Sequence, residues 1–327
     1  MIEQEINPAL MRMMRVRSKA QIAQGTSLFE LVSADAAHVL PAFSAGAHVT
    51  LLTPSGLTRR YSLCNAPSER DRYAIAVKRE AQGLGGSASM ADEVQQGSLI
   101  RVSMPKNDFP LVAGASSYLF IAGGIGITPI MSMMAQARAE GRSYQLVYCT
   151  RDADSTAFLA ELSNPESAAH CLIHHDFGER EKSYNFAALL ATAQPGIHVY
   201  CCGPTPLMRA VRELTRHWLH GSTHFEDFGS TAKESAAPGQ DAPFTVRLAR
   251  KGISVSVPAD KSILDALRGE GLALPSSCES GTCGSCRTGL ISGEAEHRDF
   301  VLDEDEFATQ IMICVSRARS QELVLDI

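Results

Sequence analysis

Residues 278–286 read Cys-Glu-Ser-Gly-Thr-Cys-Gly-Ser-Cys, and a further cysteine, Cys314, follows after 27 intervening residues. The spacing C-x4-C-x2-C with a distant fourth cysteine is that of a plant-type [2Fe–2S] centre, whose two irons need four thiolates. Gly281 and Gly284 permit tight turns and leave backbone N–H groups free to face the sulfurs. We therefore expect this cluster to be bound by Cys278, Cys283, Cys286 and Cys314.

Two other interpretations of these cysteines are a structural zinc site and a set of buried, unliganded thiols. Zinc sites usually combine two short Cys/His pairs, whereas the fourth ligand here is a lone cysteine. The chain has nine cysteines at irregular spacing and no secretory signal, which makes a poor disulfide framework.

Residues 243–327 surround the cysteine segment and predict a small α+β domain. Two strands are expected at residues 244–248 and 253–257, followed by a helix with Ser262 as N-cap and Asp265 three residues later. Gly269 or Gly271 can end that helix. The preceding residues 229–242 are small and polar, which predicts a linker.

Residues 112–228 alternate short apolar strands with helical patterns, which predicts a parallel α/β sheet. In residues 120–131 a strand leads through Gly123, Gly124 and Gly126 into a helix. We expect Thr128 to be its N-cap, with Pro129 in the first turn. Such a loop lets a pyrophosphate approach a helix N-terminus, although a plain capping turn is the alternative.

Two further strand ends in this region are candidate ligand sites, because open α/β sheets bind ligands at their carboxyl ends. Residues 199–208 repeat the order of strand, glycine, proline and helix. Arg151 follows another strand and can hold a phosphate. The neighbouring Asp152 favours NADH over NADPH, since a 2′-phosphate requires a basic site.

Residues 1–111 predict many short strands, as in a β-barrel, with β-rich runs at 27–31, 48–52 and 73–77. Residues 59–64, Arg-Arg-Tyr-Ser-Leu-Cys, end one such strand and offer a cation, an aromatic ring and a hydroxyl. Residues 83–87 precede a helix and form a second possible anion site. The alternative is a strand with an exposed arginine pair and a turn.

The composition narrows the class of protein. A length of 327 residues suggests two or three domains, and a net charge of −6 argues against general nucleic-acid binding. No apolar run approaches the roughly 20 residues of a membrane span. The acidic start at residues 1–5 lacks a secretory pattern, so we expect a cytoplasmic monomer.

Together these motifs resemble the phthalate dioxygenase reductase family, within the ferredoxin–NADP⁺ reductase superfamily. The matching stretches are residues 60–65, 122–129, 200–204 and 276–284. The resemblance implies a multidomain chain with an antiparallel β-barrel FMN domain (1–111) and an α/β parallel-sheet NAD domain (112–228). A linker (229–242) and a C-terminal α+β, β-grasp ferredoxin domain (243–327) would follow.

The resemblance also implies roles for individual residues. Ser62 would lie near the reactive flavin nitrogen, Thr128 between flavin and nicotinamide, and Cys202 in the NADH cleft, which makes these three the candidate catalytic positions. Which arginine meets the flavin phosphate stays open, because Thr58-Arg59-Arg60 departs from the expected order. The implied cofactor-binding residues are Arg59, Arg60, Tyr61, Ser62, Ala76, Val77, Lys78, Leu84, Gly85, Gly86, Ser87, Gly123, Gly124, Gly126, Thr128, Arg151, Gly203, Pro204 and Phe228.

A member of this family takes a hydride from NADH and passes electrons one at a time to the Rieske centre of a separate oxygenase. The implied acceptor is an aromatic-ring dioxygenase, and a Rieske demethylase or other monooxygenase is the alternative. A flavin and iron–sulfur redox sensor is the alternative from another class. The acidic run 303–306 is either a docking patch or a solvated turn.

Overall fold

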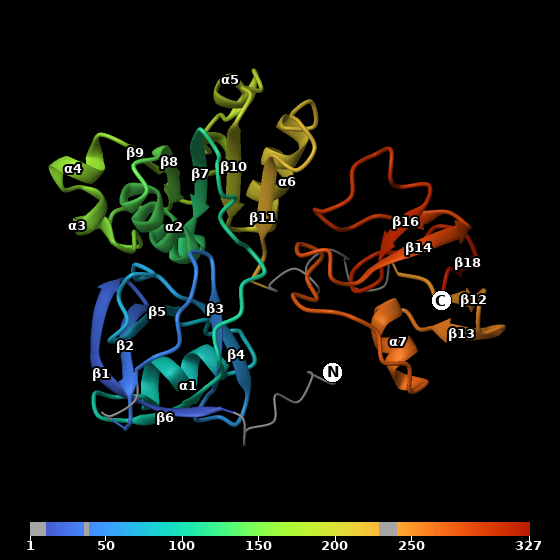
Figure 1. Cartoon of the computed structure of the whole chain (residues 1–327), viewed down its shortest axis with the longest axis horizontal. Helices are drawn as coiled ribbons and strands as arrows, with labels where there is room; N and C mark the ends of the chain where they lie inside the picture. The colour runs from blue at the N-terminus through green and yellow to red at the C-terminus, as the bar shows by residue number, and fades with distance from the viewer. Residues whose placement is uncertain (1–10, 36–38, 229–240) are drawn as a thin grey trace. The chain divides into compact units, whose positions relative to one another are not determined.

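The computed structural model describes residues 11–35, 39–228 and 241–327. The chain forms two compact units that divide between His224 and Phe225, and Figure 1 shows the elements of each. Most of the predicted linker 229–242 lies outside the described residues, which resume at Asp241.

The N-terminal domain is a six-stranded sheet in the order β4-β3-β6-β1-β2-β5 (Figure 1). The strand pairs β1–β2, β1–β6, β2–β5, β3–β4 and β3–β6 are all antiparallel, and a bridge from Leu63, directly after β4, to Ile75 of β5 connects the two edges of the sheet. This confirms the predicted antiparallel barrel. The strands are β1 (Arg12–Ala23), β2 (Thr26–Ser33), β3 (His48–Leu52), β4 (Thr58–Ser62), β5 (Tyr73–Lys78) and β6 (Leu99–Val102).

Alternation along β5 gives its two faces different partners. Ile75 and Val77 belong to the barrel core, together with Met90 of helix α1 (Gly86–Glu93). Ala74 and Ala76 point to the opposite face and join the core of the next domain. The period-2 geometry of a strand therefore makes β5 a wall shared by two domains.

The middle domain is a five-stranded sheet in the order β11-β10-β7-β8-β9, with the pairs β10–β7, β7–β8 and β8–β9 parallel. This confirms the predicted α/β sheet. Its strands are β7 (Ser117–Gly123), β8 (Ser143–Thr150), β9 (Cys171–His175), β10 (Ile197–Cys202) and β11 (Thr223–Glu226). Its helices are η2 (Gly124–Gly126), α2 (Ile127–Ala139), α3 (Leu159–Leu162), α4 (Pro165–Ala168), η3 (Arg180–Lys182), α5 (Ala187–Leu190) and α6 (Thr205–Leu214).

The barrel and the α/β sheet share one apolar core, which fixes the strand ends of one against the loops of the other. Ala45 and Ala76 from the barrel pack in the same cluster as Ile127 and Met133 from α2. The backbone N–H of Ala45 also donates to Gln136 Oε1 at 3.1 Å. Burial of such apolar surface is the main force that holds domains together.

The C-terminal domain is a mixed five-stranded sheet in the order β13-β12-β18-β14-β16, with β12 and β18 parallel. Ser262 and Asp265 form the predicted capping box at the start of α7 (Ile263–Gly269). The strands are β12 (Phe244–Leu248), β13 (Ile253–Val257), β14 (Arg287–Ser292), β16 (Gln310–Met312) and β18 (Glu322–Leu325), with a small pair of β15 (Ala295–Glu296) and β17 (Arg317–Ala318). No helix in the described part of the chain is long and apolar enough to cross a membrane.

Candidate functional site

The two arginines of β4 project to opposite faces of the strand. A Cβ built on Gly86 would stand 2.7 Å from Nε and 2.9 Å from Cγ of Arg59, so the Arg59 side chain lies against the first turn of α1. Arg60 is exposed on the other face. The geometry therefore brings Arg59, and not Arg60, to the glycine segment.

The N-terminus of α1 offers backbone donors beside the Arg59 guanidinium. Gly85 is the N-cap in the left-handed region (φ +91°), and the first turn carries no acidic residue. The hydroxyl of Ser87 accepts the Glu80 backbone N–H at 3.1 Å, which fixes the approach to the helix, whereas Leu84 is exposed. Helix N–H groups and a guanidinium together fit the phosphate of a flavin.

Tyr61 and Ser62 lie at the end of β4. The Tyr61 hydroxyl is buried without a hydrogen-bond partner among the described residues. Burial raises the pKa of Tyr61 to about 12, with the charge of Arg59 acting in the opposite direction. Ser62 is buried. A buried hydroxyl left unsatisfied by the protein fits a site that a ligand completes.

The next strand of the predicted flavin site, β5, presents its three candidates differently. Val77 lies in the barrel core, Ala76 faces the shared core, and Lys78 is exposed with its Nζ 3.4 Å from Glu80 Oε1. Because its side chain lies in the barrel core, Val77 can contact a flavin only through its backbone.

Three glycines bring the carboxyl ends of β7 and β10 together. A Cβ on Gly126 would stand 2.2 Å from the carbonyl oxygen of Cys202, and one on Gly203 would stand 2.9 Å from Gly123 Cα. Gly124 is left-handed (φ +53°), and its carbonyl accepts the Tyr148 hydroxyl at 3.0 Å. A larger residue at Gly123, Gly126 or Gly203 would push apart the two strand ends, which in a parallel sheet form the ligand-binding edge.

The predicted N-cap at Thr128 is wrong. The N-cap of α2 is Gly126, which ends the 3₁₀ turn η2, and α2 begins at Ile127. Thr128 therefore lies inside the first turn, 2% exposed, and its hydroxyl donates back to the Ile125 carbonyl at 3.0 Å. Pro129 lies in that first turn, as predicted.

Cys202 ends β10, Pro204 follows it, and Arg151 follows β8. Cys202 is fully buried, and Pro204 is the N-cap of α6. Arg151 is exposed after β8. The neighbouring Asp152 accepts the Ser155 backbone N–H at 2.8 Å, and this hydrogen bond lowers the pKa of Asp152, which keeps its carboxylate charged. Phe228 follows β11 and is 46% exposed.

The four late cysteines are free thiols brought together in two pairs, although Cys314 is 28 residues from Cys286 in sequence. Cys286 Sγ and Cys314 Sγ lie 3.1 Å apart, and the Cys278 backbone N–H points to Cys283 Sγ at 3.4 Å. Two more backbone N–H groups, those of Ser280 and Thr282, point to Cys278 Sγ at 3.4 Å.

These contacts favour thiolate at one sulfur of each pair. The Cys283 thiol lowers the pKa of Cys278, and the N–H groups of Ser280 and Thr282 act in the same direction. In the second pair, the Cys314 thiol lowers the pKa of Cys286. Iron–sulfur clusters are held by thiolates whose sulfurs accept backbone hydrogen bonds, so the four residues fit such a cluster.

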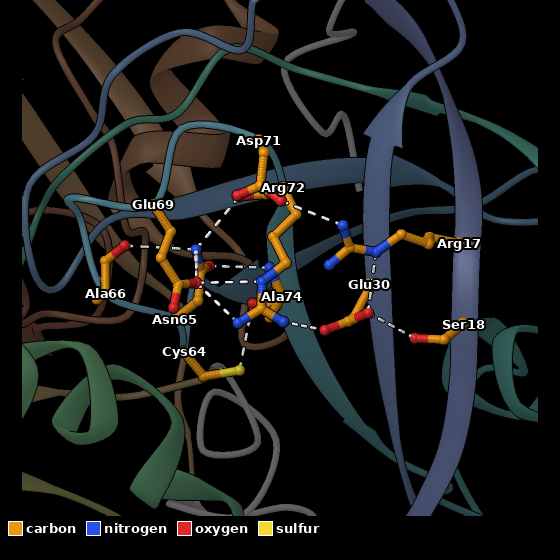
Figure 2. Close-up of polar contacts among 10 residues, drawn as sticks. All are labelled: Arg17, Ser18, Glu30, Cys64, Asn65, Ala66, Glu69, Asp71, Arg72 and Ala74. Carbon is orange, nitrogen blue, oxygen red and sulfur yellow. Dashed lines mark hydrogen bonds and ion pairs between the residues drawn. The ribbon is translucent and has the colours of Figure 1, made fainter. Parts of the chain in front are cut away.

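The sequence interpretation gave no role to Asn65, which the structure places at the centre of a polar network (Figure 2). Its Oδ1 accepts the Ala74 N–H at 2.9 Å, and its Nδ2 donates to Glu69 Oε2 and to the Arg72 carbonyl, both at 3.2 Å. Arg72 continues the network to Glu69 at 2.8 Å and to Glu30. Asn65 thereby fastens the loop after Ser62 to β5. The signal in the sequence that could have identified this role was an amide residue, Asn65, three positions after Ser62.

Comparison with known families covers most of the chain. An oxidoreductase FAD-binding domain matches residues 13–110, an oxidoreductase NAD-binding domain matches 120–213, and a 2Fe-2S iron-sulfur cluster binding domain matches 246–319.

Curated relatives and a solved structure agree over nearly the full length. Phthalate dioxygenase reductase of Burkholderia cepacia is 51% identical over 315 residues, covering 96% of this chain and 97% of the relative. The phthalate 4,5-dioxygenase oxygenase reductase subunit of Pseudomonas putida is 52% identical, covering 96% of each. A solved phthalate dioxygenase reductase, described as modular for electron transfer from pyridine nucleotides to [2Fe–2S], matches with a TM-score of 0.69 and 50% identity, over 97% of this chain and 98% of that one. The chain therefore belongs to the phthalate dioxygenase reductase family of NAD(H)-dependent flavin and iron–sulfur oxidoreductases.

Proposed function

We propose that this chain carries electrons from NADH to the Rieske centre of a separate oxygenase that hydroxylates an aromatic ring, as the reductase component of a phthalate-type dioxygenase system. The observation that carries the proposal is that one chain combines three features: the two glycine-lined strand ends, the Arg59–Gly86 anion site, and the cluster of Cys278, Cys283, Cys286 and Cys314. Relatives that share this order over 96% of the chain are named as phthalate dioxygenase reductases.

The bound groups supply the redox chemistry: a flavin accepts a hydride as an electron pair, and a [2Fe–2S] cluster carries single electrons. The chain's own residues bind and orient these groups. Gly123, Gly126 and Gly203 keep the dinucleotide edge open to a backbone approach. Thr128 and Ser62 are proposed to border the reacting ring atoms, since both are buried at element ends beside the shared core.

The flavin is proposed to be FMN. A guanidinium and a helix N-terminus meet at Gly86, which suits the terminal phosphate of a mononucleotide. NADH is the proposed donor because the charged carboxylate of Asp152 stands beside Arg151 at the strand end, where a 2′-phosphate would be repelled. Phe228, which follows β11 in the chain, is proposed to cover a face of the flavin ring.

The proposal is tested by adding purified holoprotein and NADH to a purified phthalate-type oxygenase with its aromatic substrate. We expect coupled formation of the hydroxylated product. Turnover only with a demethylase component would identify the demethylase, and not a ring dioxygenase, as the electron acceptor. Slow NADH-dependent reduction of added cytochrome c would instead favour a redox sensor.

A further inference from the structure

Glu279 directly follows the cluster ligand Cys278 and has a left-handed backbone, with φ +54°. Only three residues other than glycine have a positive φ in the described chain, and the others, Phe158 and Phe177, lie in the α/β domain. L-residues adopt this conformation when their surroundings hold them there. At Glu279 it turns the chain so that the next N–H, that of Ser280, points to Cys278 Sγ at 3.4 Å.

Arg268, in the last turn of α7, holds the Glu279 side chain. Its Nη2 lies 2.8 Å from Glu279 Oε1, and its side chain is only 15% exposed. Ser276 accepts from the same guanidinium and donates its hydroxyl to Glu279 Oε1 at 2.8 Å. Two residues from two segments, Arg268 and Ser276, therefore donate to one carboxylate oxygen of Glu279.

The Arg268–Glu279 pair differs from the surface ion pairs of the same domain. Arg250, for example, pairs with Asp326 but is 70% exposed. Exposed pairs contribute little because water and salt screen them, whereas a partly buried pair loses much when one partner is removed. Arg268 Nη1 is itself buried without a partner in the described chain, so Glu279 and Ser276 are its main anchors.

We propose that Arg268 is a positioning residue for electron transfer, which holds Glu279 left-handed and so aims the N–H groups of Ser280 and Thr282 at Cys278 Sγ. Hydrogen bonds to cluster sulfurs stabilise the more negative, reduced form and raise the reduction potential. Through Glu279, Arg268 thus makes the cluster a better acceptor. The inference rests on the cluster of the proposed electron route but not on the identity of the oxygenase.

The first variant is Arg268→Gln in the full-length holoprotein, with the potential read by a redox titration of the EPR signal of the reduced cluster. We expect the equilibrium constant for one-electron reduction to fall about tenfold, which is about 59 mV. NADH-to-flavin transfer should keep its parent rate. Arg250→Gln removes an exposed arginine of the same domain and should leave the potential unchanged.

Loss of the arginine charge also lowers the potential, so two double variants separate charge from position. Arg268→Gln with Glu279→Gln and Arg268→Gln with Glu279→Gly carry the same net charge as the parent. Only glycine adopts a left-handed backbone freely. We expect the glycine double variant to recover most of the shift and the glutamine double variant to stay low.

Equal potentials for the two double variants would overturn the proposal, and equal potentials at the parent value would assign the fall in Arg268→Gln to the lost charge. If Arg268→Gln does not retain iron, Arg268→Lys is titrated; it keeps the charge without the planar fork and should show a smaller fall. An unchanged potential in that variant would also contradict the proposal. Failure of oxygenase turnover with all potentials as expected would count against the proposed function alone.

Discussion

The Arg59 side chain lies against Gly86, close enough that a Cβ there would stand 2.7 Å from Arg59 Nε. This contact joins the start of β4 to the first turn of α1, and the two residues are 27 positions apart in the sequence. It distinguishes two adjacent arginines that the sequence alone left equivalent.

We expect Arg59→Gln to weaken flavin binding at least tenfold, because charge-assisted hydrogen bonds to phosphate contribute about 1.5–3 kcal/mol. The dissociation constant is measured by the recovery of flavin fluorescence on dilution. Arg60→Gln is the matched control and should change binding less than twofold. A larger effect at Arg60 than at Arg59 would contradict the assignment.

Gly126→Ala should destabilise the protein by about 1–3 kcal/mol through overpacking, since the new methyl group would stand 2.2 Å from the Cys202 carbonyl oxygen. Denaturant unfolding measures this change, and the KM for NADH should rise with it. Gly269→Ala is the control, because nothing lies within 4 Å of a Cβ there. Equal stability of both variants would argue against contact between the two strand ends.

Asn65→Ala should cost about 1–3 kcal/mol in the free energy of unfolding, since it leaves the buried Ala74 N–H without its acceptor. Bound flavin should be lost more readily too, because the network in Figure 2 fixes the chain behind Ser62. Flavin content after gel filtration is the measurement. Full flavin retention would mean that the network stabilises the barrel without positioning the site.

His224 predicts a pH dependence of stability. Burial, and then the neighbouring His198, lowers the pKa of His224 from 6.5 to about 4. His224 Nε2 lies 3.0 Å from His198 Nδ1, and the ring stacks on Tyr200. As the pH falls, His224 is therefore protonated in the unfolded chain before it is protonated in the folded chain. The contribution of neutral His224 to the free energy of unfolding is fully present above pH 6.5 and is lost towards pH 4, by at most about 1.4 kcal/mol per pH unit. His224→Phe should flatten this slope in urea titrations between pH 4 and 7; an unchanged slope would exclude His224 as its source.

The domain architecture followed from the sequence because it depends on local signals. The strands at 48–52, 244–248 and 253–257 are observed at the predicted residues, and so is the capping box at Ser262. Period-2 alternation and capping hydrogen bonds depend on residues only a few positions apart, so a short stretch of sequence is enough to predict them.

The start of α2 and the long-range contacts were beyond local reasoning. Thr128 is a good N-cap by residue type, but the N-cap is Gly126, whose missing side chain lets it lie against Cys202, far along the chain. The contacts of Arg59 with Gly86, Arg268 with Glu279 and Asn65 with Ala74 join separate segments in the same way. No spacing rule within one segment predicts them.

We expect electrons from NADH to pass within this chain to a [2Fe–2S] cluster held by Cys278, Cys283, Cys286 and Cys314. This route is measured by iron, sulfide and flavin analysis combined with EPR spectra before and after anaerobic addition of NADH, on the parent and on Cys314→Ser. We expect about two irons, about two sulfides and one flavin per parent chain, with a reduced-cluster signal that grows on adding NADH. Cys314→Ser should lose the iron and the signal yet keep its flavin reducible by NADH. Zinc without sulfide in the parent, or a cluster that NADH leaves oxidised, would rule out this electron route.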